Sequence, residues 1–169
     1  MTVSPQDPTA AFWPTSMQEL EDAERFLVWS FRRWALGLAR NDGGQWSLVW
    51  NGFARRFGSR DGRAALGGLA TLMGALGEHA RRAVRHHQPC CPCLGADEAW
   101  LVSFVGACQR GERSRARLLA EWMVAGAGVG DLLAAGLRLA AALDAHAMAL
   151  PARGRDGRPA GGGARPVLH

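Results

Sequence analysis

The chain has 169 residues, of which 48 % are hydrophobic, and it carries 20 basic residues against 15 acidic ones. This length suits one domain with a substantial core, and this hydrophobic content excludes a chain that is disordered throughout. Every basic residue is arginine, and the chain has 22 glycines and no tyrosine. Such a composition is typical of a GC-rich bacterial genome, so the arginine content by itself is weak evidence for nucleic-acid binding.

The amino-terminal residues lack the basic and apolar regions of a secretory signal peptide, so we expect a cytoplasmic protein without structural disulfides. The most apolar stretch, residues 132–150, includes Arg138, Asp144 and His146. Charges at the centre of a bilayer are costly. This stretch is therefore expected to be a buried helix, and no membrane association is predicted.

The first helix is predicted from a capping pattern and from its apolar spacing. Residues 1–14 contain three prolines and are expected to form a flexible arm. The sequence Ser16-Met17-Gln18-Glu19 is a capping-box pattern, which predicts that the helix begins at Ser16. Apolar residues follow at three- and four-residue spacing as far as Leu38, and the Asn-Asp-Gly-Gly turn at residues 41–44 ends the helix.

Two further helices are predicted over residues 45–57 and 63–85, with a turn at residues 58–62 between them. Four glycines at positions 67–77 lie inside the second of these helices. Because glycine is unfavourable in an exposed helix, they indicate the close approach of another helix. Three arginines at positions 81–85 are expected in its last turns, where cations interact favourably with the helix dipole.

The second half of the chain is predicted to be helical as well. A fourth helix is expected to begin near Ala96, with Asp97 and Glu98 at its positively polarised end. A fifth helix follows over residues 112–124. Asp131 is expected to cap a final helix that ends by residue 150.

The predicted fold is all-α: a single helical bundle of about five to six helices over residues 15–150. Residues 151–169 are rich in Arg, Gly and Pro and are predicted to form a disordered tail. This tail has four arginines and one aspartate, a net charge of +3, whereas the rest of the chain has 16 arginines and 14 acidic residues, a net charge of +2. The folded body is thus nearly balanced in charge.

Thiol and imidazole groups are concentrated in the loop at residues 86–93, His-His-Gln-Pro-Cys-Cys-Pro-Cys. Cys90 and Cys93 have the C-x-x-C spacing with which two thiolates bind one ion from a tight turn. Thiolate and imidazole ligands favour zinc, so we predict a metal site with zinc as the expected ion. Cys108 is an alternative fourth ligand, or two copies of the chain share the ion. The predicted ligands are His86, His87, Cys90, Cys91 and Cys93.

The same cysteines allow other interpretations. Residues 90–93 match the C-x-P-C form of a dithiol site, which favours a thiol-based redox regulator, although no strand precedes them. The Cys91-Pro92 dipeptide also matches haem-regulatory motifs. In a purely structural interpretation the cysteines are buried as small apolar side chains. We expect this for Cys108, which falls on an apolar helix face.

No catalytic or nucleotide-binding motif is present, so we expect a protein without enzymatic activity. The favoured function is a small cytoplasmic protein-interaction or regulatory protein whose 86–93 loop binds zinc, with a protein partner or a second copy of the chain. The alternatives are a redox regulator that uses Cys90, Cys91 and Cys93, and a nucleic-acid-associated regulator with a basic tail.

One candidate surface for a protein partner lies on the first helix. Trp29, Arg32 and Arg33 are close together in the sequence, and tryptophan with arginine is typical of interaction surfaces. These residues are expected either to pack or to form an exposed aromatic and basic face.

Overall fold

The computed structural model describes residues 14–153. This part of the chain is a bundle of α-helices, with short 3-10 turns and two isolated β-bridges but no strand, and it confirms the predicted all-α fold. Its elements in chain order are η1 (Met17–Glu19), α1 (Asp22–Arg40), α2 (Gly43–His79), α3 (Ala96–Gln109), α4 (Arg113–Met123), η2 (Gly126–Gly128) and α5 (Val129–Asp144).

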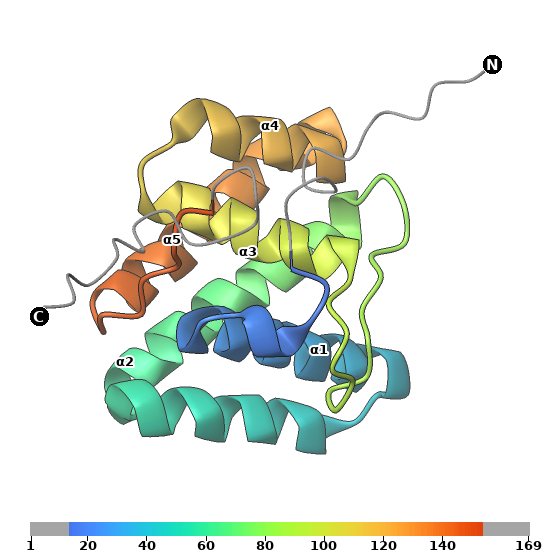
Figure 1. The fold of residues 1–169 in the computed structure, drawn as a ribbon. Coiled ribbons are helices and arrows are strands. Elements are labelled where there is room, and N and C mark those ends of the chain that lie inside the picture. The colour runs from blue at the N-terminus through green and yellow to red at the C-terminus, as the bar shows by residue number, and fades with distance from the viewer. Residues whose placement is uncertain (1–13, 154–169) are drawn as a thin grey trace, which may run out of the picture.

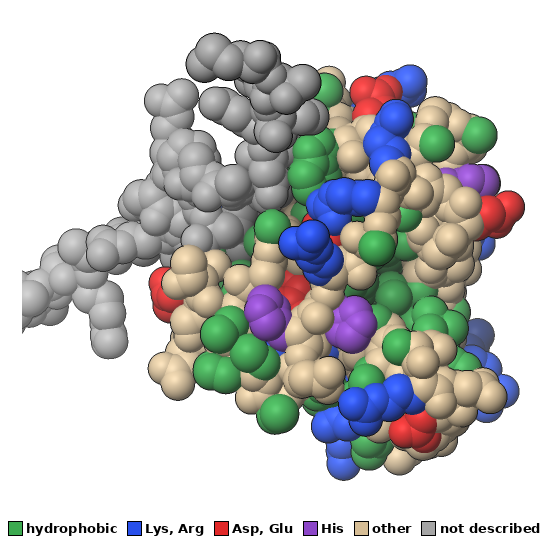
Figure 2. All heavy atoms as spheres, turned by 90° about the vertical axis from the view of Figure 1, so that its right-hand side faces the viewer, with side chains coloured by type: hydrophobic (Ala, Val, Ile, Leu, Met, Phe, Trp, Pro, Cys, Tyr) green, Lys and Arg blue, Asp and Glu red, His purple; other side chains and the backbone are tan. Residues whose placement is uncertain are grey.

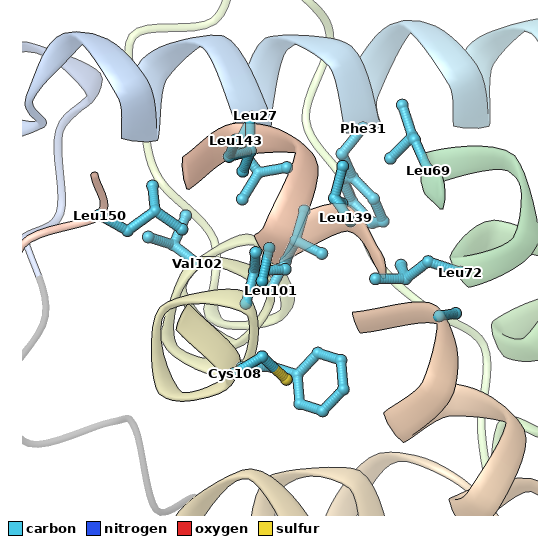
Figure 3. Close-up of a cluster of buried hydrophobic side chains, with 14 of the residues drawn as sticks. Leu27, Phe31, Leu69, Leu72, Leu101, Val102, Cys108, Leu139, Leu143 and Leu150 are labelled. Atoms are coloured by element: carbon cyan, nitrogen blue, oxygen red, sulfur yellow. The ribbon is translucent and has the colours of Figure 1, made fainter. Parts of the chain in front are cut away.

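The helices enclose one hydrophobic core (Figure 1). α1 and the first half of α2 run side by side in opposite directions, α5 packs against α2 and α3, and α4 contacts α3 and α5. α3 is buried on nearly all sides and the other helices contribute an apolar face, so burial of apolar surface drives the assembly. Figure 3 shows buried side chains that meet at the centre, among them Leu27, Phe31, Leu69, Leu72, Leu101 and Leu139.

α1 begins later than the capping-box pattern predicted, because that pattern caps a different element. The Ser16 hydroxyl accepts a hydrogen bond from Gln18 N at 3.2 Å, and this caps the 3-10 turn η1. α1 itself begins at Asp22, where the Glu24 carboxylate accepts from Glu21 N at 2.7 Å. The end of the helix falls at the Asn-Asp-Gly-Gly turn, as predicted.

α2 joins the two helices that were predicted over residues 45–57 and 63–85. Gly58 departs from helical geometry (φ 75°, ψ 168°), so the expected turn is a kink that glycine tolerates. α2 also ends before the predicted residue 85, because the backbone after it pairs with the end of α4. Arg81 N donates to Met123 O at 3.0 Å, and Ala125 N donates to His79 O at 2.8 Å. The arginines at positions 81–85 therefore lie outside the helix.

The later helices lie close to their predicted positions. α3 and α4 are joined by a tight turn at Gly111, whose φ of 68° favours glycine. α5 begins at Val129 rather than at a cap formed by Asp131, because η2 leads directly into it. Asp131 lies in the first turn of α5, where a carboxylate still interacts favourably with the helix dipole.

The end of the described chain is attached to α1 by a buried ion pair. Arg153 donates to both carboxylate oxygens of Glu24, with Nε to Oε1 at 2.7 Å, and its side chain is 4 % exposed. Residues 151–153, which were predicted as the start of the disordered tail, therefore belong to the folded body. The predicted arm, apart from Pro14, and the predicted tail from residue 154 onward lie outside the described residues. The nucleic-acid role of the tail stays a prediction.

One segment, Gly126–Asp144, is long and apolar enough to span a membrane by length and composition, with 19 residues and a mean hydropathy of 1.4. Leu132, Leu139 and Leu143 within it are buried in the core of the bundle. The core helix of a soluble protein meets the same criteria. The segment is thus compatible with the predicted buried helix.

Two adjacent glycines in α2 provide a test of how closely α2 and α5 pack. A Cβ on Gly68 would lie 3.1 Å from the Cα of Leu139, whereas a Cβ on Gly67 would meet nothing within 4 Å. We expect Gly68→Ala to lower the free energy of unfolding by about 1–3 kcal/mol. Gly67→Ala should raise it by about 0.5–1 kcal/mol, because alanine is the better helix former. Urea denaturation measures both changes, and equal effects would contradict the close approach at Gly68.

Candidate functional site

The predicted His/Cys loop belongs to a longer extended segment, residues 80–95, between α2 and α3. Figure 1 shows this segment passing along the side of α1 before it returns to α3. Its second half pairs with the chain around the start of η1: Met17 N donates to Pro92 O at 2.8 Å, and Leu94 N donates to Thr15 O at 2.8 Å. Two prolines prevent the segment from continuing as a helix, so its backbone groups find partners elsewhere.

One buried cation, Arg32 of α1, holds the inner side of the loop. Its side chain is 0 % exposed. The guanidinium donates to three backbone carbonyls, with contacts of 3.3 Å to Gln88 O, 2.7 Å to Cys91 O and 2.5 Å to Cys93 O. Backbone carbonyl groups, which bind Arg32, thus hold the loop in its shape; contacts of the cysteine side chains do not.

Glu98, in the first turn of α3, balances the charge of Arg32 and is also 0 % exposed. The two side chains form a bidentate pair, with Nε to Oε1 and Nη2 to Oε2 both at 2.8 Å. The Glu98 carboxylate also accepts from the backbone N–H groups of His87 and Gly95, each at 2.8 Å. A buried ion pair needs such additional hydrogen bonds to offset the loss of water from both charges.

These hydrogen bonds determine the ionisation of Glu98. Burial is the largest single influence and raises the pKa of this carboxyl group, but the hydrogen bonds from Arg32, Gly95 and His87 outweigh it. Together they lower the pKa of Glu98 from 4.5 to about 2. The carboxylate is therefore ionised at neutral pH, and the pair with Arg32 persists under physiological conditions.

Of the two alternatives for Trp29, Arg32 and Arg33, the exposed aromatic and basic face does not include Arg32, which is fully buried. Glu98 has a role beyond the expected interaction with the helix dipole, because it is the partner of Arg32. One sequence signal does place Arg32 inside. Arg32 follows the apolar Val28 by four residues, so both side chains lie on the buried face of α1.

A second acidic residue of α3 fixes the first part of the segment. Asp97, which is 2 % exposed, accepts from the Arg82 guanidinium at 2.6 and 2.8 Å and from Arg85 N at 2.7 Å. The Arg82 guanidinium also lies over the ring of Trp122 on α4, 5.0 Å from its centroid. These arginines, which were predicted to interact with the end of a helix, instead attach the segment to α3 and α4.

The loop presents three thiols, of which Cys90 and Cys93 are exposed and Cys91 is half-buried. The Cys91 side chain lies within hydrogen-bonding reach of the Cys93 thiol, and it raises the pKa of Cys93 above the usual value of 9. One residue separates Cys91 from Cys93, whereas two residues separate Cys90 from Cys93 in the predicted C-x-x-C pair. Because Arg32 binds the carbonyl groups of Cys91 and Cys93, the loop framework holds these two cysteines in place.

The two histidines of the loop are engaged with its framework. Nδ1 of His87 lies 3.1 Å from Oε2 of Glu98, and its ring packs on Gly95, where a Cβ would lie 3.0 Å from the ring. Nδ1 of His86 lies 3.2 Å from the carbonyl oxygen of His87. The His86 ring meets that of Phe31 edge-on, with centroids 6.5 Å apart. Neither imidazole is directed to the cysteine pair by these contacts.

A closed structural zinc site needs four ligands in a tetrahedral arrangement. Within residues 14–153, no group of three or more His, Cys, Asp or Glu side chains is placed to hold one ion. Cys91 and Cys93 are two of the five predicted ligands and lie together. The zinc site formed by His86, His87, Cys90, Cys91 and Cys93 stays a prediction.

Cys108, the alternative fourth ligand, lies in the core of the bundle, as expected. It is 7 % exposed, and burial raises the pKa of its thiol to about 11. A Cβ on Gly136 of α5 would lie 3.1 Å from its sulfur. Cys108 therefore packs as an apolar side chain, and it differs in environment from the three thiols of the loop.

A cleft of about 560 Å³ opens beside the loop, between α1 and the end of α2. Its walls include the apolar residues Leu38, Met73 and Leu76. Figure 2 shows this face: hydrophobic side chains line the hollow, and histidine and arginine side chains stand beside it. Residues 82–84 and His86 belong to its lining. A rearrangement of the loop would therefore change the shape of the cleft.

Glu98 makes the stability of the fold sensitive to acid. Because its pKa is lower in the folded protein than the ordinary 4.5, the carboxylate stabilises the fold fully above pH 4.5, and this stabilisation is lost as the pH falls toward 2. We expect Glu98→Gln to be less stable by about 3–5 kcal/mol at neutral pH, since Arg32 then stays buried without a counter-charge. Urea denaturation at several pH values should show this difference shrinking between pH 4.5 and 2.

The matched control is Glu112→Gln. The pKa of Glu112 is also lowered by an arginine, Arg110, but this pair lies near the surface. Its loss should therefore cost less than about 1 kcal/mol. A Glu98→Gln deficit that stayed constant down to pH 2, or that matched the control, would contradict the role given to the buried pair.

Comparison with protein-family models, with curated proteins and with solved structures found no match to the chain. Its function is therefore inferred from its own residues and their geometry.

Proposed function

We propose that the protein is a small cytoplasmic regulatory protein in which Cys91 and Cys93 form a reversible thiol switch. The observation that carries the proposal is that Cys91 and Cys93 lie one residue apart on a surface loop, with the backbone carbonyl of each held by Arg32. The raised pKa of Cys93, caused first by the Cys91 side chain, is consistent with their proximity. Permanent disulfides are rare in the cytoplasm, but disulfides that form and are reduced again are used there as redox sensors. The arrangement thus favours the redox regulator over the zinc-organised loop.

The switch needs an oxidant, and a peroxide is the simplest class. The Cys91 thiolate attacks a peroxide oxygen, the O–O bond breaks and water leaves after protonation, so that Cys91 carries a sulfenic acid. The Cys93 sulfur then attacks the Cys91 sulfur, the S–O bond breaks and a second water leaves. Two thiols and one hydrogen peroxide thus give one disulfide and two waters. A dithiol reductant reverses the reaction by exchange.

The order of the two steps follows from the raised pKa of Cys93. The hydrogen bond with the Cys91 side chain raises the pKa of Cys93, so the thiolate form of Cys93 is disfavoured. Cys91 is therefore assigned as the attacking thiolate and Cys93 as the residue that resolves the sulfenic acid. Because the thiolate is the reactive form, oxidation should become faster as the pH rises.

Oxidation would be transmitted into the fold through Arg32. A disulfide that spans a single residue closes a small, strained ring, which makes it easy to reduce. Its formation shifts the carbonyl groups of Cys91 and Cys93, and both accept hydrogen bonds from Arg32. The shift would reach the pair with Glu98 and the lining of the cleft at His86. A protein partner bound at that cleft would then distinguish the two redox states.

Thiol counting tests the switch. Mild peroxide should remove two of the four titratable thiols from the denatured wild type, with the mass falling by two hydrogen atoms, and a dithiol reductant should restore both. Cys91→Ser and Cys93→Ser should each abolish this intramolecular disulfide. The matched controls are Cys90→Ser, at an exposed loop position, and Cys108→Ser, in the core. Both control variants should still form the Cys91–Cys93 disulfide.

Two results would overturn the assignment. If Cys90→Ser abolished the disulfide and Cys91→Ser did not, the C-x-x-C pair would be the reactive one. If all loop thiols were oxidised to sulfinic acids without any disulfide, the loop would have no switch. Tryptic peptide mapping of the oxidised protein distinguishes these results from the expected Cys91–Cys93 bond.

A zinc site shared by two chains is the second candidate, and the same thiol pair favours it. Two thiolates on the loop of one chain would supply half of a tetrahedral site made of four cysteines, and a two-fold axis would supply the other half. Cys91 and Cys93 would then be the ligands, and the partner would be a second copy of the chain. The ligands would lose their protons on binding, so the dimer would weaken at acid pH.

Elemental analysis of protein purified without a histidine tag tests this second candidate. We expect one zinc for every two chains, and a dimer in gel filtration that a chelator converts to monomer. Cys91→Ser should lose both the metal and the dimer, whereas Cys90→Ser should keep them. A zinc-free monomer would exclude the shared site. One zinc per chain that His86→Ala releases would instead support the five-ligand site within one loop.

A further inference from the structure

A second groove lies between the end of α3, α4 and α5. Its volume of about 510 Å³ falls within the range of small-molecule sites. We propose that this groove binds a medium-chain carboxylate, a fatty acid of about ten carbons, with its chain along the groove and its carboxylate at the arginines of α4. This inference does not depend on the thiol switch. The apolar lining residues are Ala107, Cys108, Ala116, Leu133 and Leu137.

The walls of the groove fit an alkyl chain. Ala107 and Cys108 come from α3 and Ala116 from α4, and their small side chains leave the space open. Leu133 and Leu137 lie one helical turn apart on α5, and Leu137 is 53 % exposed. Exposed leucine surface of this kind is removed from water when an alkyl chain covers it.

The charges at the groove fit an anionic head group. The lining contains Arg113 and Arg117, one turn apart on α4, and no acidic residue. Arg117 is paired with Glu121, with Nε to Oε1 at 2.8 Å. Among the described residues, no carboxylate pairs with the Arg113 guanidinium. A carboxylate ligand would supply that partner, whereas an uncharged or cationic amphiphile would not.

Calorimetric titration of the full-length protein with sodium decanoate, below its micellar concentration, tests the proposal. Decanoate should bind at one site per chain, and decanol should bind more weakly. Octanoate, which is shorter by two methylenes, should bind about tenfold more weakly than decanoate if the chain is buried. The same titration on the Cys91→Ser/Cys93→Ser protein should be unchanged, so a failure of the thiol switch leaves this result intact.

Substitutions at exposed positions of the groove locate the ligand without disturbing the core. Arg113→Gln should weaken decanoate binding by about threefold to fivefold and leave decanol binding unaffected. Arg115→Gln is its control, because Arg115 lies on the same helix but outside the groove. Leu137→Gln should weaken both ligands. Leu118→Gln, at a leucine that is 64 % exposed and also outside the groove, should weaken neither.

Three results would overturn the proposal. Decanoate that did not bind up to its micellar concentration would exclude a carboxylate site. Binding that Arg113→Gln and Leu137→Gln left unchanged would place the ligand elsewhere. A wild-type dimer in sedimentation that Leu137→Gln converted to monomer, without decanoate binding, would show that a second copy of the chain covers the groove.

Discussion

The buried pair of Arg32 and Glu98 is the interaction on which the loop and its thiols depend. A guanidinium has five N–H donors and no acceptor, so in a dry interior it needs several oxygen atoms around it. Glu98 supplies the counter-charge, and the backbone carbonyls of Gln88, Cys91 and Cys93 supply the other acceptors. The segment between α2 and α3 has few apolar side chains to bury. Its order therefore comes from this polar framework rather than from hydrophobic packing.

This framework explains why the thiols face outward. A loop closed by a metal ion directs its sulfur atoms inward, whereas this loop directs carbonyl groups inward to Arg32 and exposes Cys90 and Cys93. The same hydrogen bonds connect the loop to a charge in the core. Under the proposed function, a chemical change at Cys91 or Cys93 would alter the environment of a buried ion pair, where uncompensated charge is costly.

α1 holds both long non-helical segments of the described chain, with one buried charge near its beginning and one near its middle. Glu24, near its beginning, binds Arg153 of the carboxy-terminal segment, and Arg32, farther along, binds the loop before α3. In both cases an arginine and a glutamate distant in sequence are paired in the interior. Some of the arginines of this lysine-free chain thus have structural roles. The planar, permanently charged guanidinium suits such sites because it forms several directed hydrogen bonds at once.

The sequence by itself determined the class of the fold and the position of most helices, because apolar spacing and turn residues act over a few positions. It also placed Cys108 in the core, since that residue follows Phe104 by one turn on an apolar face. Only the tertiary structure decided where α2 ends, because His79 and Arg81 pair with the backbone at the end of α4. Only the tertiary structure buried Arg32, whose partner Glu98 lies 66 residues away. The path of the loop that carries Cys91 and Cys93 had the same origin. Local spacing names candidate ligands, but a long-range charge pair binds the carbonyl groups of both residues.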